Sequence, residues 1–519
     1  MIKGLLWLTL ADALHCPGLA VRDRLASVCL RENDTEMASK DIYENPLVSR
    51  NASPEMCALF SPRRRILTWR RVWLALAEAE AELGLPITPG QLTQLRKSIE
   101  DIDFDRAAHF ENKLRHDVMA HLHAWGEVAP KAKGVLHLGA TSMDIVDNAD
   151  VILMREAMEL VRDWLVNVVD ALGAFATKHK KLPCLGYTHF QPAQLTTVGR
   201  RAALWCYDFV RDFDEIDGRI AALRLRGVRG ATGTQASFLS LFKGDARKVA
   251  RLEKLVSKKL GFKEVEPVTG QTYTRKIDAQ VAAALGNIAA SAHKFANDIR
   301  ILARLKEIEE PFEKSQVGSS AMAYKRNPMR CERMTGLSRY VLSIMTSPFQ
   351  TAAEQWFERT LDDSSNKRVT TPEGFLAVDG ILRLVTDVSR GLVVYPKVID
   401  ANVQAELPFM ATEEILMAAV AGDGKRGNST GDRQELHERI RTHSMAAAEQ
   451  VKLHGRANDL MDRLKNDDAF SGVDLDAALD AKRFVGLSVE QVDHFVKTFV
   501  SPILRRHRAA RNKPVSLSV

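Results

Sequence analysis

Long stretches of helical periodicity are the feature that most constrains this chain. One runs from residue 144 to about 180, and another from 281 until Pro311 stops it. A third begins in "SPRRRILTWRRVWLALAEAEAELGLP", where Ser61 is a good N-cap and a later Gly and Pro close the helix. Alternation with the two-residue period of a strand is hard to find. The pattern predicts an all-α protein with a long helical bundle at its centre.

The balance of charge limits the possible partners. The chain has a net charge of +7, from 73 basic and 66 acidic residues that interleave along its 519 positions. Interleaved charges indicate a mixed, solvated surface rather than a nucleic-acid-binding face. A modest basic surplus also suits an enzyme that attracts anionic substrates. A basic nucleic-acid-binding or scaffold protein is kept as the alternative of a different class.

Cysteine usage and hydropathy bear on the compartment. The six cysteines form no C-x-x-C motif, and buried thiols in a reducing compartment are expected, which suggests the cytoplasm. No apolar run reaches the length that spans a bilayer, so we expect no transmembrane helix. Residues 1–36 differ from the rest because arginines and acidic residues alternate there, and Met37 is a plausible second start of the protein. We expect an extension outside the fold, with a targeting peptide as the alternative.

Two common ligand motifs are absent or incomplete. In "RHDVMAHLHAW", His116 and His123 are seven residues apart, about 10 Å along a helix, whereas a zinc pair needs a spacing of four. We expect no metal there, although His116 can still bind a ligand. The glycines of "GVRGATG" lack the dinucleotide-binding spacing, and no Walker A sequence occurs. A bound phosphate would be held by side chains such as Arg, Lys and Ser.

Two segments place polar groups ahead of expected helices. "HLGATSMD" has Thr141 and Ser142 where helix capping is the default role, and the same hydroxyls could hold a carboxylate. "GYTHFQPAQLTTVGRR" places His189 between a short polar loop and a helix expected after Pro192. Alone, this histidine is as consistent with a backbone hydrogen bond as with catalysis.

"GSSAMAYKRNPM", residues 318–329, is harder to explain as a structural loop. It combines Ser319, Ser320, Lys325 and Asn327, and "MRCER" follows directly. A reaction that removes a proton beside a carboxylate needs such a set, because the developing negative charge requires fixed cations and donors. A serine can act as the base if its alkoxide is stabilised and a closing loop excludes water.

This segment resembles the signature loop of the fumarase, aspartase and argininosuccinate lyase superfamily. Other segments narrow the resemblance to the eukaryotic adenylosuccinate lyase family, over roughly residues 40 to 500. They include "SPEMC", "RHDVMAH", "HLGATS", "THFQPAQLTTVG", "TGQTYTRK", "WFERTLDDS" and "ELPFMATE". The resemblance implies the three-domain, all-helical superfamily fold, with domains expected at 37–141, 142–394 and 395–519. It also implies a homotetramer in which three chains contribute to each active site.

The implied activity is elimination of fumarate from adenylosuccinate to give AMP, and the same reaction on the succinyl-carboxamide intermediate SAICAR to give AICAR. No metal or organic cofactor is implied. Ser319 matches the general base and His189 the general acid, which makes chemical sense because a neutral amine leaves more readily than its anion. Glu332 matches a carboxylate that orients catalytic side chains. The positions matching the carboxylate-binding residues are Thr141, Ser142, Lys325 and Asn327. Those matching other substrate-contacting or nucleotide-binding residues are Arg50, Arg115, His116, Asp117, Gln271, Arg333, Arg359, Ser364 and Arg368, and we also expect Lys325 and His116 to be catalytic.

Two positions depart from the family pattern. Asn51 stands where the family usually has tyrosine beside the phosphate site, so its substrate-binding role is carried over with a changed side chain. Ala323 replaces a proline of the signature loop, which makes the loop less stiff but removes no catalytic group. Another lyase of the superfamily, such as an argininosuccinate lyase, is the alternative within the enzyme class.

Overall fold

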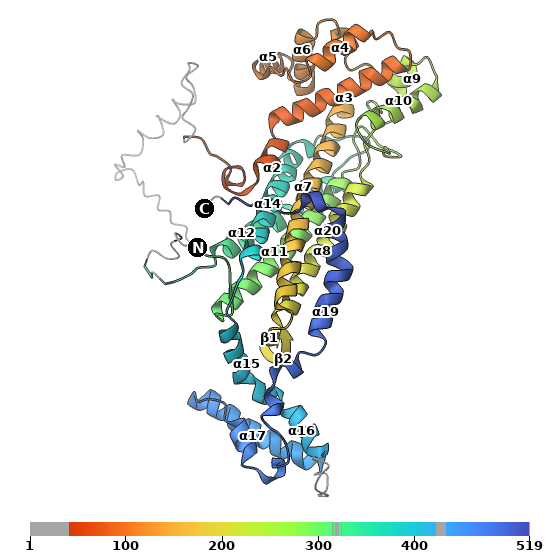
Figure 1. The fold of residues 1–519 in the computed structure, drawn as a ribbon. Coiled ribbons are helices and arrows are strands. Elements are labelled where there is room, and N and C mark those ends of the chain that lie inside the picture. Colours follow the sequence, from red (N-terminus) through yellow and green to blue (C-terminus); the bar gives the residue numbers. More distant parts are fainter. Residues whose placement is uncertain (1–40, 314–315, 317–320, 323, 422–431, 518–519) are drawn as a thin grey trace, which may run out of the picture. The chain divides into compact units, whose positions relative to one another are not determined.

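Five helices form the centre of the computed structural model, which describes residues 41–313, 316, 321–322, 324–421 and 432–517. Residues 46–519 form one unit and residues 1–45 another. The expected extension at 1–36 lies outside the described residues. The central helices are α7 (Ser142–His179), α8 (Val198–Ala222), α11 (Lys276–Arg304), α12 (Met329–Ile344) and α14 (Asp363–Gly391), and they pack along one another (Figure 1).

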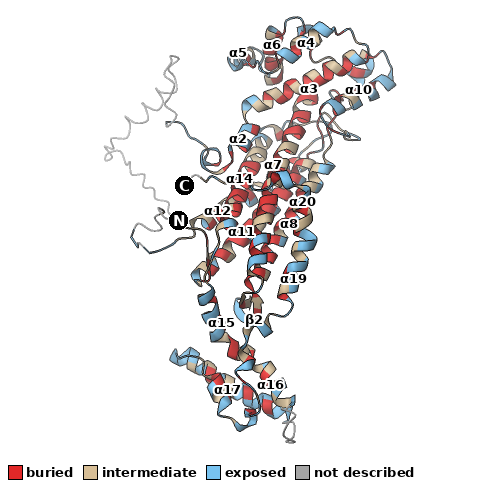
Figure 2. Ribbon diagram, in the orientation of Figure 1, coloured by how far each residue is buried: buried red, intermediate tan, exposed pale blue. Residues whose placement is uncertain are grey.

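The buried faces of these helices form the main core (Figure 2). In α7 the apolar side chains recur at helical spacing, and those from Val161 to Val169 are almost all buried. α14 is buried nearly all round from Gly374 to Val388, because helices cover it on several sides. The all-α prediction is confirmed. The helix expected at 281–311 begins earlier, at Lys276, and ends at Arg304, before Pro311.

A smaller set of helices lies before the bundle in sequence. It comprises the π-helical turn η2 (Leu47–Asn51), α2 (Pro54–Leu59), α3 (Pro62–Glu82), α4 (Pro89–Lys97), α5 (Phe104–Leu114), α6 (Asp117–Val128) and the 3-10 turn η3 (Lys133–Val135). The hydroxyl of Ser61 accepts from the backbone N–H of Arg64 at 3.2 Å, so the predicted N-cap of α3 is confirmed. α3 packs against α7 and α10 (Ala246–Lys259), while α9 (Ala236–Leu241) lies in the connection before α10.

One predicted helix start is wrong. The segment after Pro192 is a strand rather than a helix, because β1 (Pro183–Thr188) pairs antiparallel with β2 (Gln191–Thr197), and α8 begins only at Val198. His189 and Phe190 form the two-residue turn between these strands. A second small sheet pairs β3 (Ile308–Glu309) with β4 (Val393–Val394).

The last part of the chain divides between two cores. α15 (Pro396–Met410) contacts β1, and a separate apolar cluster forms around α16 (Thr412–Ala421), α17 (Arg433–His454) and α18 (Leu460–Lys465). After the 3-10 turns η4 (Asp468–Phe470), η5 (Ala477–Leu479) and η6 (Ala481–Phe484), the chain returns to the bundle. There α19 (Ser488–Phe495), η7 (Val496–Val500), α20 (Ser501–Arg506) and η8 (Arg508–Ala510) follow, and these elements contact α7 or α8. The three-domain division stays a prediction.

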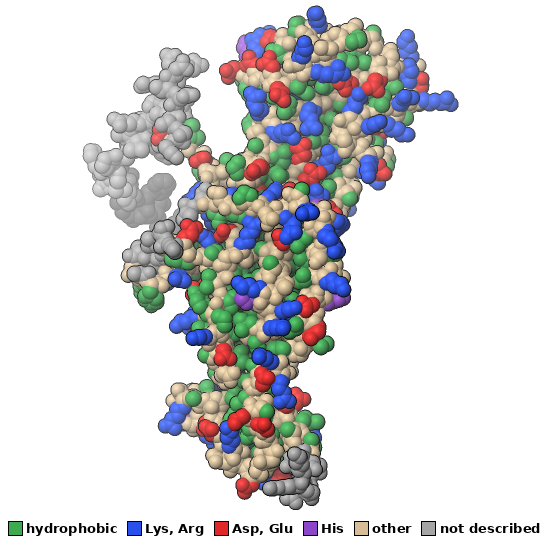
Figure 3. All heavy atoms as spheres, viewed as in Figure 1, with side chains coloured by type: hydrophobic (Ala, Val, Ile, Leu, Met, Phe, Trp, Pro, Cys, Tyr) green, Lys and Arg blue, Asp and Glu red, His purple; other side chains and the backbone are tan. Residues whose placement is uncertain are grey.

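Helix hydropathy and surface charge bear on whether the described residues could contact a membrane or a nucleic acid. None of their helices is both long and apolar enough to cross a membrane. On the face shown in Figure 3, basic and acidic side chains are interspersed, with hydrophobic side chains between them over the bundle.

Candidate active site

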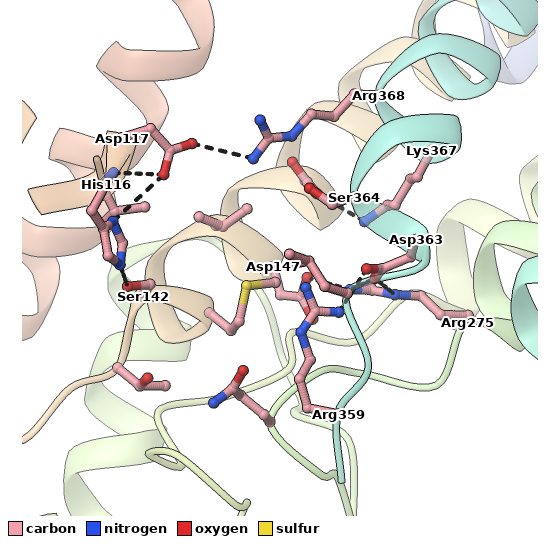
Figure 4. Close-up of a pocket in the computed structure, with 17 residues that line it drawn as sticks. His116, Asp117, Ser142, Asp147, Arg275, Arg359, Asp363, Ser364, Lys367 and Arg368 are labelled. Atoms are coloured by element: carbon pink, nitrogen blue, oxygen red, sulfur yellow. Dashed lines mark hydrogen bonds and ion pairs between the residues drawn. The ribbon is translucent and has the colours of Figure 1, made fainter. Parts of the chain in front are cut away.

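Four separate segments enclose a cavity of about 320 Å³ (Figure 4). They are the start of α6, the start of α7, the loop before α11, and the segment that leads into α14. Its lining residues are His116, Asp117, Val118, Thr141, Ser142, Met143, Val146, Asp147, Asp150, Gln271, Arg275, Arg359, Leu361, Asp363, Ser364, Lys367 and Arg368. The fold therefore brings together these residues expected to bind substrate: His116, Asp117, Thr141, Ser142, Gln271, Arg359, Ser364 and Arg368.

The N-terminus of α7 is anchored by the buried carboxylate of Asp144. This carboxylate accepts from the backbone N–H of Thr141 at 2.8 Å and from that of Arg229 at 2.7 Å, and it pairs with the buried guanidinium of Arg226. Asp144 therefore fixes the first turn of α7, where Ser142 lies on the cavity.

The glycine motif "GVRGATG" forms the loop whose backbone N–H groups bind the carboxylate of Asp144. Its first and last glycines, Gly227 and Gly233, have φ of +85° and +82°, in the left-handed region that glycine tolerates best. A Cβ at Gly233 would also lie 1.9 Å from the carbonyl oxygen of Thr269. The glycines let the loop wrap around Asp144, which gives the motif a structural role.

His116 is the N-cap residue of α6 and reaches across to α7. Its Nδ1 lies 3.5 Å from the backbone nitrogen of Met119, and its Nε2 lies 3.4 Å from Ser142 Oγ. If Nδ1 accepts the backbone N–H, the proton is on Nε2 and is directed at the serine hydroxyl. An imidazole and a hydroxyl thus meet at the edge of the cavity, both able to contact an anionic ligand.

The other two histidines of this motif have structural environments. Burial, with Arg65 and Arg70 nearby, lowers the pKa of His121 to about 4, and its ring packs edge-on against Trp69. His123 stacks on Phe110. Among the described residues, no group of three His, Cys, Asp or Glu side chains is arranged to hold a metal ion.

The cations of the cavity are paired with carboxylates. Arg368 lies 3.2 Å from Asp117, and Lys367 lies 2.8 Å from Asp150. Arg359 contacts Asp363 at 2.7 Å and therefore has a fixed position on the cavity wall (Figure 4). An anionic ligand would meet cations that the protein already holds in place, an arrangement that favours tight electrostatic binding.

A second cluster of expected residues forms where α12 meets η2. Arg333 donates from Nε to Asn51 Oδ1 at 2.8 Å and also to the backbone oxygen of Arg50. Burial, together with Arg50 and Arg383, lowers the pKa of Arg333. Three arginines thus come near one another, which is an electrostatic environment suited to a phosphate group.

Residues of the signature loop are only partly described. Ser319, Ser320 and Ala323 lie outside the described residues. Lys325 is exposed, and Asn327 lies two residues before α12. Glu332 is an exposed residue in the first turn of α12. Arg115 is exposed in a left-handed conformation just before His116, but it does not line the cavity.

His189 lies elsewhere, in the turn between β1 and β2. His189 and Phe190 have φ of +51° and +60°, and both side chains are exposed. Such angles suit the twist of a two-residue hairpin, but they cost energy for a bulky residue such as Phe190. A strained, exposed turn that presents an imidazole is consistent with a functional role.

Of the carboxylates on the cavity wall, Asp117 was predicted from the sequence, but Asp147, Asp150 and Asp363 were not. Asp144, Asp147 and Asp150 recur every three residues in α7, and that spacing predicts one face of the helix. This signal could have identified Asp147 and Asp150. Arg275 lies within the segment "TGQTYTRK" that carried the resemblance, and Lys367 follows the segment "WFERTLDDS", but nothing local in the sequence distinguishes them.

Comparisons with known proteins agree with this picture. The family described as "Lyase" matches residues 52–343, and "Adenylosuccinate lyase C-terminus" matches residues 408–495. The chain is 52% identical to adenylosuccinate lyase of Saccharomyces cerevisiae, over 90% of this chain and 97% of that protein. It is 51% identical to adenylosuccinate lyase of Schizosaccharomyces pombe, over 89% and 95%.

Solved structures share the fold. The 3-carboxy-cis,cis-muconate lactonizing enzyme of Pseudomonas putida superposes with a TM-score of 0.74 at 24% identity, over 89% of this chain and 99% of that one. The fumarate lyase of Mesorhizobium sp. BNC1 gives 0.72 at 24% identity, over 88% and 100%. Because the match to the yeast enzymes covers nearly the whole length of both partners, this chain belongs to the adenylosuccinate lyase family.

Proposed function

We propose that this protein eliminates fumarate from adenylosuccinate to release AMP, and from SAICAR to release AICAR, in the cytoplasm. Both substrates carry a phosphate and two carboxylates. The observation that carries the proposal is the cavity at the start of α7, where hydroxyls, an imidazole and fixed cations come together from four segments. Family membership over nearly the whole chain supports the same assignment.

In the proposed reaction, Ser319 takes a proton from the succinyl carbon next to a carboxylate. The carbon–nitrogen bond then breaks, and His189 delivers a proton to the departing nitrogen. One proton is removed and one is supplied, so the step balances without an electron acceptor. Lys325, Asn327, Thr141 and Ser142 hold the carboxylates that carry the developing negative charge.

The remaining expected residues would bind the rest of the substrate. Arg50, Arg333, Arg359, Ser364 and Arg368 are assigned to the nucleotide part and its phosphate. Asn51 is assigned to a contact beside the phosphate. Arg115, His116, Asp117 and Gln271 are assigned to other contacts with the substrate. Glu332 is assigned to orienting catalytic side chains.

A complete site requires a second chain. Ser142 begins α7, whereas the His189 turn follows the end of α7. The 38 residues of this helix span about 57 Å. Even a β1 strand of six residues, folded back along the helix, would recover only about 20 Å of that distance. The hairpin lies at the far end of α7 from α6 (Figure 1). We therefore propose that His189 serves a cavity on another subunit of a homotetramer.

Exposed apolar side chains support such an assembly. Phe349 on α13 (Ser347–Ala353) is half exposed, and Leu204 on α8 is similarly exposed. Shortly before Arg359 in the sequence, Trp356 is 65% exposed, and Phe357 is fully exposed with a φ of +45°. Exposed apolar side chains of this size are candidates for contacts with other subunits.

Turnover of adenylosuccinate tests the function directly. We expect the purified protein to convert adenylosuccinate to AMP and fumarate, followed by absorbance, and His189→Ala to abolish turnover. His454→Ala, which alters an exposed histidine on α17, should leave the rate unchanged. No turnover of adenylosuccinate, together with turnover of argininosuccinate, would establish the alternative lyase. Salt-sensitive binding of nucleic acid by an inactive protein would establish the scaffold alternative.

A further inference from the structure

Arg275 is a buried arginine that touches two of the segments enclosing the cavity. It precedes the first residue of α11, and its side chain is 1% exposed. Its Nη2 lies 3.0 Å from Asp147 Oδ1 on α7, and its Nε donates to Asp363 Oδ2 on α14 at 2.7 Å. A single guanidinium therefore joins α7, α14 and its own loop before α11. This is the fork geometry for which arginine is suited and lysine is not.

The carboxylates of Asp147 and Asp363 each have a second partner, which lies in the loop before α11 or on the cavity wall. Asp147 Oδ2 accepts from the backbone N–H of Tyr273 at 2.9 Å. Asp363 Oδ1 accepts from Arg359 Nη1 at 2.7 Å. Burial would raise the pKa of Asp363, but Arg275 and Arg359 outweigh it and hold the pKa below its usual range. Asp363 is therefore charged and shared between two arginines of the cavity wall, the buried Arg275 and the more exposed Arg359.

The two loops that meet here also touch through their backbones. The N–H of Gln271 donates to the carbonyl oxygen of Glu358 at 2.9 Å. A Cβ on Gly270 would lie 2.6 Å from that same oxygen, so the loops approach as closely as glycine allows. Displacement of Arg275 would therefore move Gln271 and Arg359 together.

We propose that Arg275 is a positioning residue that, through Asp363, holds the guanidinium of Arg359 in the orientation that binds the anionic substrate. Its side chain belongs to the cavity wall but is only 1% exposed, so it acts on binding through Arg359 and not by direct contact with the substrate. This inference rests on the proposed function, because its readout is the KM for adenylosuccinate. It assigns a functional role to a buried ion pair that would otherwise be interpreted as a contribution to stability alone.

A double-mutant cycle tests the coupling. Arg275→Lys keeps the charge but cannot bridge both carboxylates, so we expect the KM to rise about ten-fold, with kcat changed less than about two-fold. In an Arg359→Ala background, Arg275→Lys should raise the KM by less than about two-fold, because the group that it positions is gone. Asp363→Asn offers a second route if Arg275→Lys does not fold, since it replaces one oxygen with an amide N–H facing an arginine. Asp363→Asn should also raise the KM when Arg359 is present, and should raise it by less than about two-fold in the Arg359→Ala background.

Arg70 provides a matched control. It is equally buried, and its guanidinium donates to the carbonyl oxygens of Ser98 and Asp101, away from the cavity. Arg70→Lys should lower the melting temperature without changing the KM.

The outcomes separate the two proposals. Equal KM effects of Arg275→Lys with and without Arg359, or a lower melting temperature with an unchanged KM, would overturn the positioning role while leaving the lyase function intact. A wild-type protein that does not turn over adenylosuccinate would overturn both.

Discussion

Mixing two inactive variants should restore activity if His116 and His189 of one site come from different subunits. His116→Ala removes the imidazole beside Ser142, and His189→Ala removes the imidazole at the hairpin turn. Both side chains are exposed, so neither change removes core packing. The length of α7, about 57 Å, keeps these groups apart within one chain. Each variant alone should fold but be nearly inactive.

The expected recovery follows from independent sampling. After equal mixing and random exchange of subunits, the chain that supplies His116 to a site has an even chance of carrying this histidine intact. The same holds for the chain that supplies His189. About a quarter of the sites then carry both, so activity should approach that fraction of wild type. Exchange is verified by native mass spectrometry of subunits with different tags, and turnover is measured before and after mixing. A mixture that stays inactive despite verified exchange would refute the proposed sharing of sites or one of the two catalytic assignments.

Three further predictions concern stability and the phosphate cluster. Burial raises the pKa of Glu80 to about 9, and its carboxylate oxygens have no hydrogen-bond partner among the described residues. The contribution of Glu80 to stability should therefore be fully present below its unfolded pKa and fall by up to about 1.4 kcal/mol per pH unit as pH rises towards 9, whereas thermal unfolding of Glu80→Gln should vary less with pH over that range. Gly233→Ala should prevent soluble expression or lower the melting temperature severely, because its Cβ would overlap the Thr269 carbonyl oxygen. Asn51→Asp should weaken AMP binding in calorimetry, since it adds a negative charge beside Arg333 where a phosphate is expected; unchanged affinity would place the phosphate elsewhere.

The helices were predictable because their signals are local. The N-cap of α3 and the periodicity of α7 and α11 are visible in short windows of sequence, and the structure has these helices close to the expected positions. The β1–β2 hairpin was missed for a physical reason. Its turn residues, His189 and Phe190, are not the Asn and Gly that usually mark such a turn. Its strands also pair over too few residues to show clear alternation.

The site was predictable from resemblance but not from local chemistry. The resemblance identified Ser142, Gln271 and Arg359, which the fold brings to one cavity. Asp147 and Asp150 were missed, because an ion pair such as that of Arg275 with Asp147 joins residues more than a hundred positions apart. Pairing over such distances is a property of the packed structure and leaves no periodic signal in the sequence.

The uninterrupted length of α7 has a consequence for how this chain can change over evolution. Inserting one residue in the middle of the helix would rotate everything beyond it by about 100° and shift it by about 1.5 Å. If the cavity end and the hairpin end serve different sites, this would misalign two catalytic centres at once, and it would also turn the buried face of half of the helix away from the core. Single-residue insertions and deletions should therefore be rejected throughout the segment from Ser142 to His179, even at its exposed positions.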